Sequence, residues 1–116
     1  MAGARDGLVG ARAALDGGSP RGATSLSYYA ILYAARAALS EEETYAKTHK
    51  GTWDLFRETF VVSGRFDSDL YERGRETQRV RERADYEAFM VPPEQARETL
   101  ELAERFVEAV DALFTE

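Results

Sequence analysis

One stretch of fourteen residues constrains the fold of this chain more than any other feature. Residues 26–39 read LSYYAILYAARAAL, and Arg36 is the only charged side chain among them. A surface helix carries its apolar residues in a stripe, so a helix that is apolar on nearly every face has to be covered on nearly every face. The segment therefore predicts a helix in the middle of a helical bundle.

This central helix has a clear start, and a shorter helix precedes it. Ser19 followed by Pro20 supplies an N-cap hydroxyl and a proline suited to the first helical position. Gly17 and Gly18 can adopt the left-handed conformation that commonly ends a helix. Apolar residues at helical spacing mark the first helix: Leu8, Ala11 and Leu15.

A third helix follows an acidic connection. Residues 40–51 read SEEETYAKTHKG, with three consecutive glutamates and no helical stripe, which predicts an exposed and mobile segment. Ser63 and Gly64 end the helix after it. The apolar residues of this short aromatic helix are Trp53, Phe56 and Phe60.

Two further helices complete the chain. Asp67 can cap the fourth helix, which we expect to reach about Phe89 with Gly74 as its only breaker. The last helix starts near Pro93. Its core stripe comprises Ala96, Leu100, Ala103, Val107, Val110 and Phe114. No segment alternates as a strand does, so we predict an all-α, up-and-down bundle of about five helices, forming a single domain over residues 1–116.

Composition narrows the possible functions. The chain has no cysteine, which excludes disulfides, thiolate catalysis and cysteine-ligated metals. Its 15 basic and 21 acidic residues give a net charge of −6, which opposes indiscriminate attraction to nucleic acid or an anionic membrane. No uninterrupted apolar segment near the N-terminus could serve as a signal peptide or membrane span. We therefore expect a cytoplasmic protein with neither DNA nor a membrane as its partner.

His49 is the only histidine. Without a cysteine or second histidine it does not indicate a metal site, and we predict no metal and no cofactor. If Thr48 caps the third helix, the positive end of the helix dipole keeps the His49 ring neutral at pH 7. Tyr28, Tyr29 and Tyr33 could stack on bases, but on an apolar helix we interpret them as core aromatics.

The segment RERADYEAF, residues 81–89, contains the charged side chain that is hardest to interpret. Arg81 shares a face of the fourth helix with Gly74, Thr77 and Ala84, so it should point toward packed surface. Asp85, one turn further on, can accept from its guanidinium. The pair is either a structural ion pair or a phosphate-binding arginine held by a carboxylate. Residue chemistry alone favours the structural role, although the desolvation of such a pair keeps the functional role open.

These segments together resemble a known family. In order they are ATSLSYYAILYAARAAL at 23–39, KTHKG at 47–51, FRETFVVSGRFD at 56–67 and RERADY at 81–86. Their order is similar to that in the compact prokaryotic branch of the HEPN superfamily, from about Ala11 to about Phe114, although Leu26 replaces the arginine usual before YYA. The resemblance implies a helical bundle that forms a homodimer, often encoded beside a minimal nucleotidyltransferase in toxin–antitoxin-like pairs.

Many HEPN proteins are metal-independent RNases, with an arginine and then, about one turn later, a histidine on the long late helix. Arg81 can stand for that arginine, but Asp85 and Tyr86 follow it and no later histidine exists. Because a carboxylate paired with an arginine is a poor base, the resemblance implies a nucleotide- or RNA-binding component of such a pair. The candidate ligand-binding or interface residues are Arg81, Asp85, Tyr86, Tyr29, Lys47 and His49.

Two alternatives to this binding function remain open. The first is an RNase toxin in which Arg81 stabilises the charge on the phosphorane and His49 transfers the proton, with Asp85 as a further catalytic candidate. The second is a purely structural helical bundle. For the homodimer, we expect an aromatic surface supplied by Tyr28, Tyr29, Trp53 and Tyr86.

Overall fold

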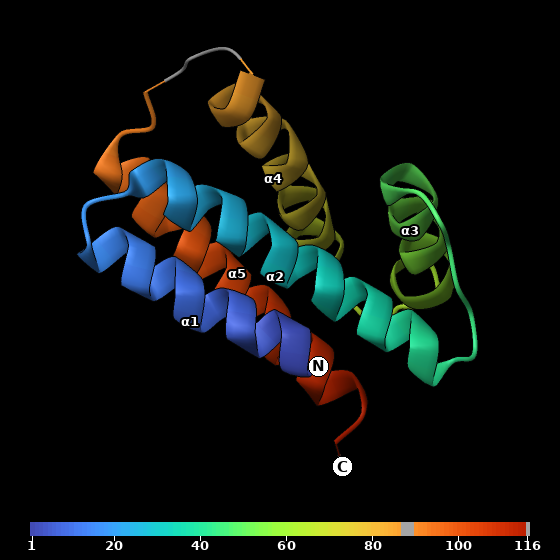
Figure 1. Ribbon diagram of the computed structural model, residues 1–116. Coiled ribbons are helices and arrows are strands. Elements are labelled where there is room, and N and C mark those ends of the chain that lie inside the picture. The colour runs from blue at the N-terminus through green and yellow to red at the C-terminus, as the bar shows by residue number, and fades with distance from the viewer. Residues whose placement is uncertain (87–89, 116) are drawn as a thin grey trace.

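The computed structural model describes residues 1–86 and 90–115, and only the backbone of Tyr86. The described residues form helices and no strands (Figure 1): α1 (Ala2–Asp16), α2 (Pro20–Glu41), α3 (His49–Phe56), the π-helical turn η1 (Arg57–Val61), α4 (Ser68–Tyr86) and α5 (Pro93–Leu113). The predicted all-α bundle of about five helices is confirmed. The predicted end of the fourth helix at Phe89 lies outside the described residues.

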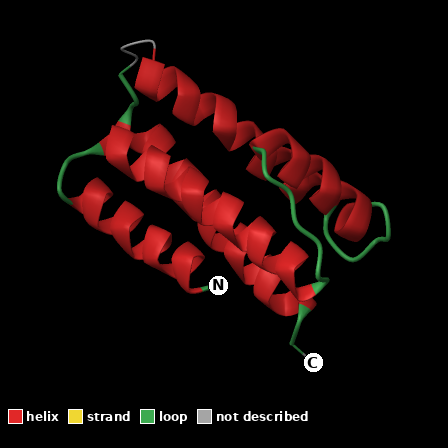
Figure 2. Ribbon diagram, turned by 45° about the vertical axis from the view of Figure 1, so that its right-hand side comes forward, coloured by secondary structure: helices red, strands yellow, loops and turns green. Residues whose placement is uncertain are grey.

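Helix α2 lies in the middle of the bundle, as its sequence predicts. It packs against α1, α3, α4 and α5. Figures 1 and 2 show α1 on one flank of α2 and α3 with α4 on the other. Its buried residues therefore fall on several sides of the helix: Ala23, Thr24, Ser27, Tyr28, Ala30, Ile31, Leu32, Ala34, Ala35, Ala38 and Leu39.

The predicted helix starts are confirmed by their capping bonds. The side chains of Ser19, Thr48 and Asp67 each accept a hydrogen bond from the backbone N–H three residues on, at 3.2, 2.9 and 2.8 Å. Gly18 has φ +84°, the left-handed conformation expected after the first helix. Local chemistry thus fixes where α2, α3 and α4 begin, and with them the position of every residue on each helix.

Helix α1 is longer than its apolar spacing predicts, because its small residues allow a close approach to α2. A Cβ added at Gly7 would lie 3.1 Å from the Cβ of Ala30, and one added at Gly10 would lie 3.2 Å from Leu26 Cδ1. Two helices this close exclude water along much of their length. The contact therefore stabilises α1 from Ala2 onward, beyond what the helix propensity of its glycines would support.

Several predictions about aromatic side chains are wrong. Trp53 and Tyr28 are fully buried, at 0% exposure, so neither supplies the surface expected for a dimer. Tyr33, predicted in the core, is 43% exposed, and Phe114, predicted in the stripe of the last helix, is 40% exposed. Phe114 lies just beyond the end of α5, and its ring packs against Phe60 in a T-shaped arrangement with centroids 6.2 Å apart.

Within the described residues, no helix is both long enough and apolar enough to cross a membrane. The longest apolar segment, in α2, instead packs against the four other helices. In the bundle around α2, the end of α4 and the start of α3 lie on the same side of α2. The candidate site lies there.

Candidate functional site

A glycine brings α4 close enough to the core for Arg81 to reach α2. A Cβ added at Gly74 would lie 2.7 Å from two ring carbons of Phe106 and 3.4 Å from Ile31 Cγ2. Arg81 lies about two turns further along the same face of α4. Its side chain is only 12% exposed. The prediction that Arg81 points toward packed surface is confirmed.

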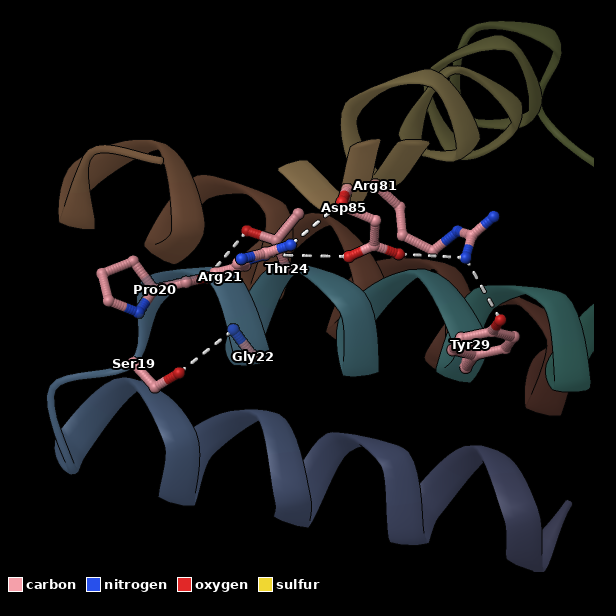
Figure 3. A network of polar contacts seen from close by, with 8 residues as sticks. All are labelled: Ser19, Pro20, Arg21, Gly22, Thr24, Tyr29, Arg81 and Asp85. Atoms are coloured by element: carbon pink, nitrogen blue, oxygen red, sulfur yellow. Dashed lines mark hydrogen bonds and ion pairs between the residues drawn. The ribbon is translucent and has the colours of Figure 1, made fainter. Parts of the chain in front are cut away.

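Arg81 is held by two tyrosines and a carboxylate, and Figure 3 shows its contacts with Tyr29 and Asp85. Its Nη1 donates to Tyr29 Oη at 3.3 Å and to Asp85 Oδ2 at 3.2 Å. Its guanidinium carbon lies 5.4 Å from the centroid of the Tyr28 ring and 5.5 Å from that of Tyr29, within the range of cation–π attraction. Its Nε is buried and has no hydrogen-bond partner among the described residues.

Asp85 is itself held in position from the start of α2. Arg21 Nη2 donates to the backbone carbonyl of Asp85 at 3.0 Å, and Arg21 Nε lies 4.0 Å from Asp85 Oδ1. Figure 3 shows Arg21 reaching from the N-terminal turn of α2 to the C-terminal turn of α4. The carboxylate therefore lies between two guanidinium groups, which fixes the side of Arg81 that it occupies.

His49 reaches Tyr28 from α3. Its Nδ1 lies 2.9 Å from Tyr28 Oη, and the two ring centroids are 5.8 Å apart. Burial lowers the pKa of His49, and the positive charges of Arg36 and Arg81 lower it further, while Glu82 opposes them. The ring is therefore neutral at pH 7, as predicted. Burial and two guanidinium groups account for this pKa shift, where the sequence suggested the helix dipole.

Tyr28 is the residue that joins these groups. It is fully buried, burial raises the pKa of its hydroxyl, and it contacts both the His49 ring and the Arg81 guanidinium. We call the five residues described here the Tyr28 cluster: Tyr28, Tyr29, His49, Arg81 and Asp85. Sequence analysis placed Tyr28 in the core or at an interface and missed this role, because the cluster is assembled by tertiary packing.

Of the predicted site residues, Lys47 does not join the cluster. Lys47 is exposed in the loop before α3, and it makes none of the contacts that link the other members. The side chain of Tyr86 lies outside the described residues. Within the described part of the chain, no three histidine, aspartate or glutamate side chains come together as a metal site would require.

A groove of about 360 Å³ between α3 and α4 adjoins the cluster. Its lining carries both signs of charge: Lys50, Glu72, Arg75, Glu76, Gln78, Arg79 and Glu82. Two of its cations already pair with one carboxylate, since Lys50 and Arg75 lie 2.6 and 3.0 Å from Asp54. The charges that line this groove are therefore balanced, and both of these cations are already paired.

Comparison with known proteins adds a family match to this geometry. The sequence matches the HEPN domain over residues 1–113. The chain is similar to "Putative toxin MJ0142" of Methanocaldococcus jannaschii, at 33% identity over 66 residues, which are 57% of this chain and 45% of that protein. It is also similar to "UPF0332 protein glr0978" of Gloeobacter violaceus, at 36% identity over 62 residues, 53% of this chain and 49% of that protein. The matches thus span about half the length of each relative.

Proposed function

The chain belongs to the HEPN domain family, as its motifs implied, and we propose that it binds a phosphate group of RNA or a nucleotide at the Tyr28 cluster, as one component of a toxin–antitoxin-like pair. The toxin role is suggested by the name of one relative, "Putative toxin MJ0142". The binding role rests on the cluster itself.

The observation that carries the proposal is the buried Nε of Arg81, which has no hydrogen-bond partner among the described residues. A buried N–H without an acceptor is rare in a native protein and calls for an explanation, such as a missing ligand. The same guanidinium is already oriented by Asp85 and by the rings of Tyr28 and Tyr29. A phosphate oxygen is the acceptor that such a pre-positioned arginine binds best.

The net charge of −6 sets a condition on this function. A chain of this charge does not attract RNA over its whole surface, so binding has to come from a few local contacts. We therefore expect a modest dependence of affinity on salt, matching one or two phosphate contacts.

Calorimetry with a single-stranded oligoribonucleotide and with adenosine monophosphate tests the proposal. Arg81→Lys keeps the charge but loses the planar donor fork, and it should weaken binding at least tenfold, because hydrogen bonds to charged groups contribute about 1.5–3 kcal/mol. Arg79→Lys is the matched control, since Arg79 lies on the same helix and is 79% exposed. Equal affinities for the two variants, or no binding by wild type, would overturn the proposal.

The proposal includes a homodimer and a nucleotidyltransferase partner. Leu26 and Tyr33, at 37% and 43% exposure, lie on α2 with Tyr29 of the cluster, and they supply the apolar surface that Tyr28 and Trp53 do not. Light scattering should give a mass twice that of one chain, which is 13.0 kDa. The Tyr33→Glu variant should be a monomer and give the mass of one chain. Val9→Glu, on exposed α1 surface, is the control.

The partner is tested separately by expressing the chain with a minimal nucleotidyltransferase encoded beside it. A stable complex on co-purification supports the pairing. Complete separation of the two proteins would remove the nucleotidyltransferase from the proposal and leave the phosphate site untouched.

An RNase is the second candidate, and one observation favours it. His49 and Arg81 both contact Tyr28. A side chain able to transfer protons and one able to bind phosphate are thus held next to the same tyrosine. Cleavage of single-stranded RNA in EDTA, lost in both His49→Ala and Arg81→Ala, would establish this enzyme. Intact RNA after incubation with wild type would exclude it.

A further inference from the structure

The contact between Tyr28 and His49 determines which ring nitrogen of the histidine carries a proton. From this contact we infer that the Tyr28 hydroxyl donates to His49 Nδ1 and so holds the ring in the tautomer protonated at Nε2. His49 then offers a hydrogen-bond donor to a ligand, and its Nε2 cannot act as a base. Tyr28 is a positioning residue in this account.

The direction of the hydrogen bond follows from the partners of the hydroxyl. Burial raises the pKa of Tyr28, so its O–H keeps its proton at neutral pH and requires an acceptor. The acceptor given by the described residues is His49 Nδ1, at 2.9 Å. If Nδ1 instead donated to the tyrosine oxygen, the buried hydroxyl proton would be left without an acceptor among the described residues, which is unfavourable.

Trp53 supports the same direction. Its indole N–H is buried and has no hydrogen-bond partner among the described residues, yet it is near enough to the Tyr28 hydroxyl to lower the pKa of that hydroxyl. An N–H near the Tyr28 oxygen favours the orientation of the Tyr28 hydroxyl in which the lone pairs of its oxygen point toward Trp53. The hydroxyl proton then turns away from Trp53 and toward His49.

The charges around His49 keep its ring neutral, so that only one of its nitrogens is protonated. Two guanidinium groups act on it, Arg36 from α2 and Arg81 from α4, and Glu82 of α4 opposes them only in part. A neutral imidazole has one donor and one acceptor nitrogen. Because the acceptor is used by Tyr28, the nitrogen left for a ligand is the donor Nε2–H.

This assignment names the chemistry that the cluster recognises. Arg81 has donors only, and His49 adds a neutral donor beside it. Together they suit an oxygen-rich anionic group such as a phosphate, which has acceptors only. In this tautomer neither side chain removes the proton of a ribose 2′-hydroxyl near neutral pH, so the tautomer counts against the RNase candidate. The donor role of His49 rests on the proposed function, whereas the tautomer does not.

The tautomer can be measured directly, because the chain has a single histidine. A ¹⁵N spectrum of the imidazole nitrogens, recorded at pH about 7.5, above the ordinary histidine pKa of about 6.5, should show Nδ1 without a proton and Nε2 with one. In Tyr28→Phe the two signals should move toward the mixture of tautomers found in a free imidazole. Tyr29→Phe removes a hydroxyl that contacts Arg81 instead, and it should leave them unchanged.

A spectrum with the proton on Nδ1 would overturn the inference, and so would identical spectra for wild type and Tyr28→Phe. The wild-type spectrum decides the tautomer even if Tyr28→Phe fails to fold. Neither outcome depends on a ligand, so failure of the proposed function leaves this test intact.

The donor role is tested with the single-stranded oligoribonucleotide. A glutamine amide N–H can occupy the place of Nε2–H but cannot act as a base near neutral pH. His49→Gln should therefore keep affinity within a few-fold, whereas His49→Ala should lose about tenfold, the contribution of one hydrogen bond to a charged group. Equal loss in both variants, or none in His49→Ala, would overturn the donor role.

Discussion

Replacing Gly74 by alanine should destabilise the protein, although alanine is the better helix former. In the interior of α4 the change gains about 0.8–1 kcal/mol of helix propensity. The new Cβ, however, would lie 2.7 Å from Cδ2 and Cε2 of Phe106. Those are atoms of a ring that is fully buried and packed among other rings, with Trp53, Phe56 and Phe66 centroids at 6.0, 5.8 and 5.0 Å.

The sign of the change in unfolding free energy depends on which of these two effects, helix propensity or the close contact with Phe106, is larger. Because the Phe106 ring cannot swing aside, the added methyl group has to push α4 and α5 apart, and overpacking of this kind costs about 1–3 kcal/mol. Subtracting the propensity gain leaves a net loss of about 1 kcal/mol. In a chain of this size that loss lowers the melting temperature by roughly 4 °C.

Urea unfolding followed by circular dichroism measures this loss as a lower midpoint at an unchanged slope. Gly3→Ala is the matched control, because its Cβ would meet the Tyr33 ring at 3.5 Å, an ordinary contact, and it should leave stability equal or slightly higher. If Gly74→Ala were as stable as wild type, α4 would not lie this close to Phe106, and the placement of Arg81 two turns on would be wrong with it.

Two further predictions concern α3. Thr48→Ala removes the hydroxyl that accepts from Gly51 N–H and should lower the free energy of unfolding by about 1 kcal/mol in urea titration; a loss under about 0.3 kcal/mol would mean that the cap does not hold α3. The second prediction concerns the stability of the protein in acid. The folded-state pKa of His49 is below its unfolded-state value. At a pH between these two values, the unfolded chain therefore binds more protons than the folded chain. The neutral ring therefore contributes its full stability above about pH 6.5, the unfolded-state pKa. This contribution is lost as the pH falls from there through the folded-state pKa. The difference in unfolding free energy between wild type and His49→Gln should shrink there, and a constant or growing difference would contradict the pKa shift.

Local features of the sequence predicted the starts of α2, α3 and α4 and the orientation of Arg81. Ser19, Thr48 and Asp67 bond to N–H groups only three residues away, so their role does not depend on the rest of the fold. Arg81 shares a face with small residues at helical spacing, and the 3.6-residue period is enough to turn it inward.

Contacts between distant residues explain what the sequence did not reveal. Tyr28 and Tyr33 lie on a helix that is apolar nearly all round, so its pattern could not say which side faces solvent. The neighbouring helices decide this, burying Tyr28 and leaving Tyr33 43% exposed. The bond from Tyr28 to His49 joins residues 21 positions apart, and no local pattern marks it. The π-helical turn at Arg57–Val61 was likewise not predicted.

The central claim is that a phosphate-bearing ligand binds at the Tyr28 cluster, and backbone amide shifts in a ¹H–¹⁵N spectrum test it most directly. During titration with a single-stranded oligoribonucleotide, the largest and saturable changes should occur at Tyr28, Tyr29, His49 and Arg81, on three different helices. Changes centred on Arg75 and Arg79 in the groove between α3 and α4, or no saturable change, would contradict the claim.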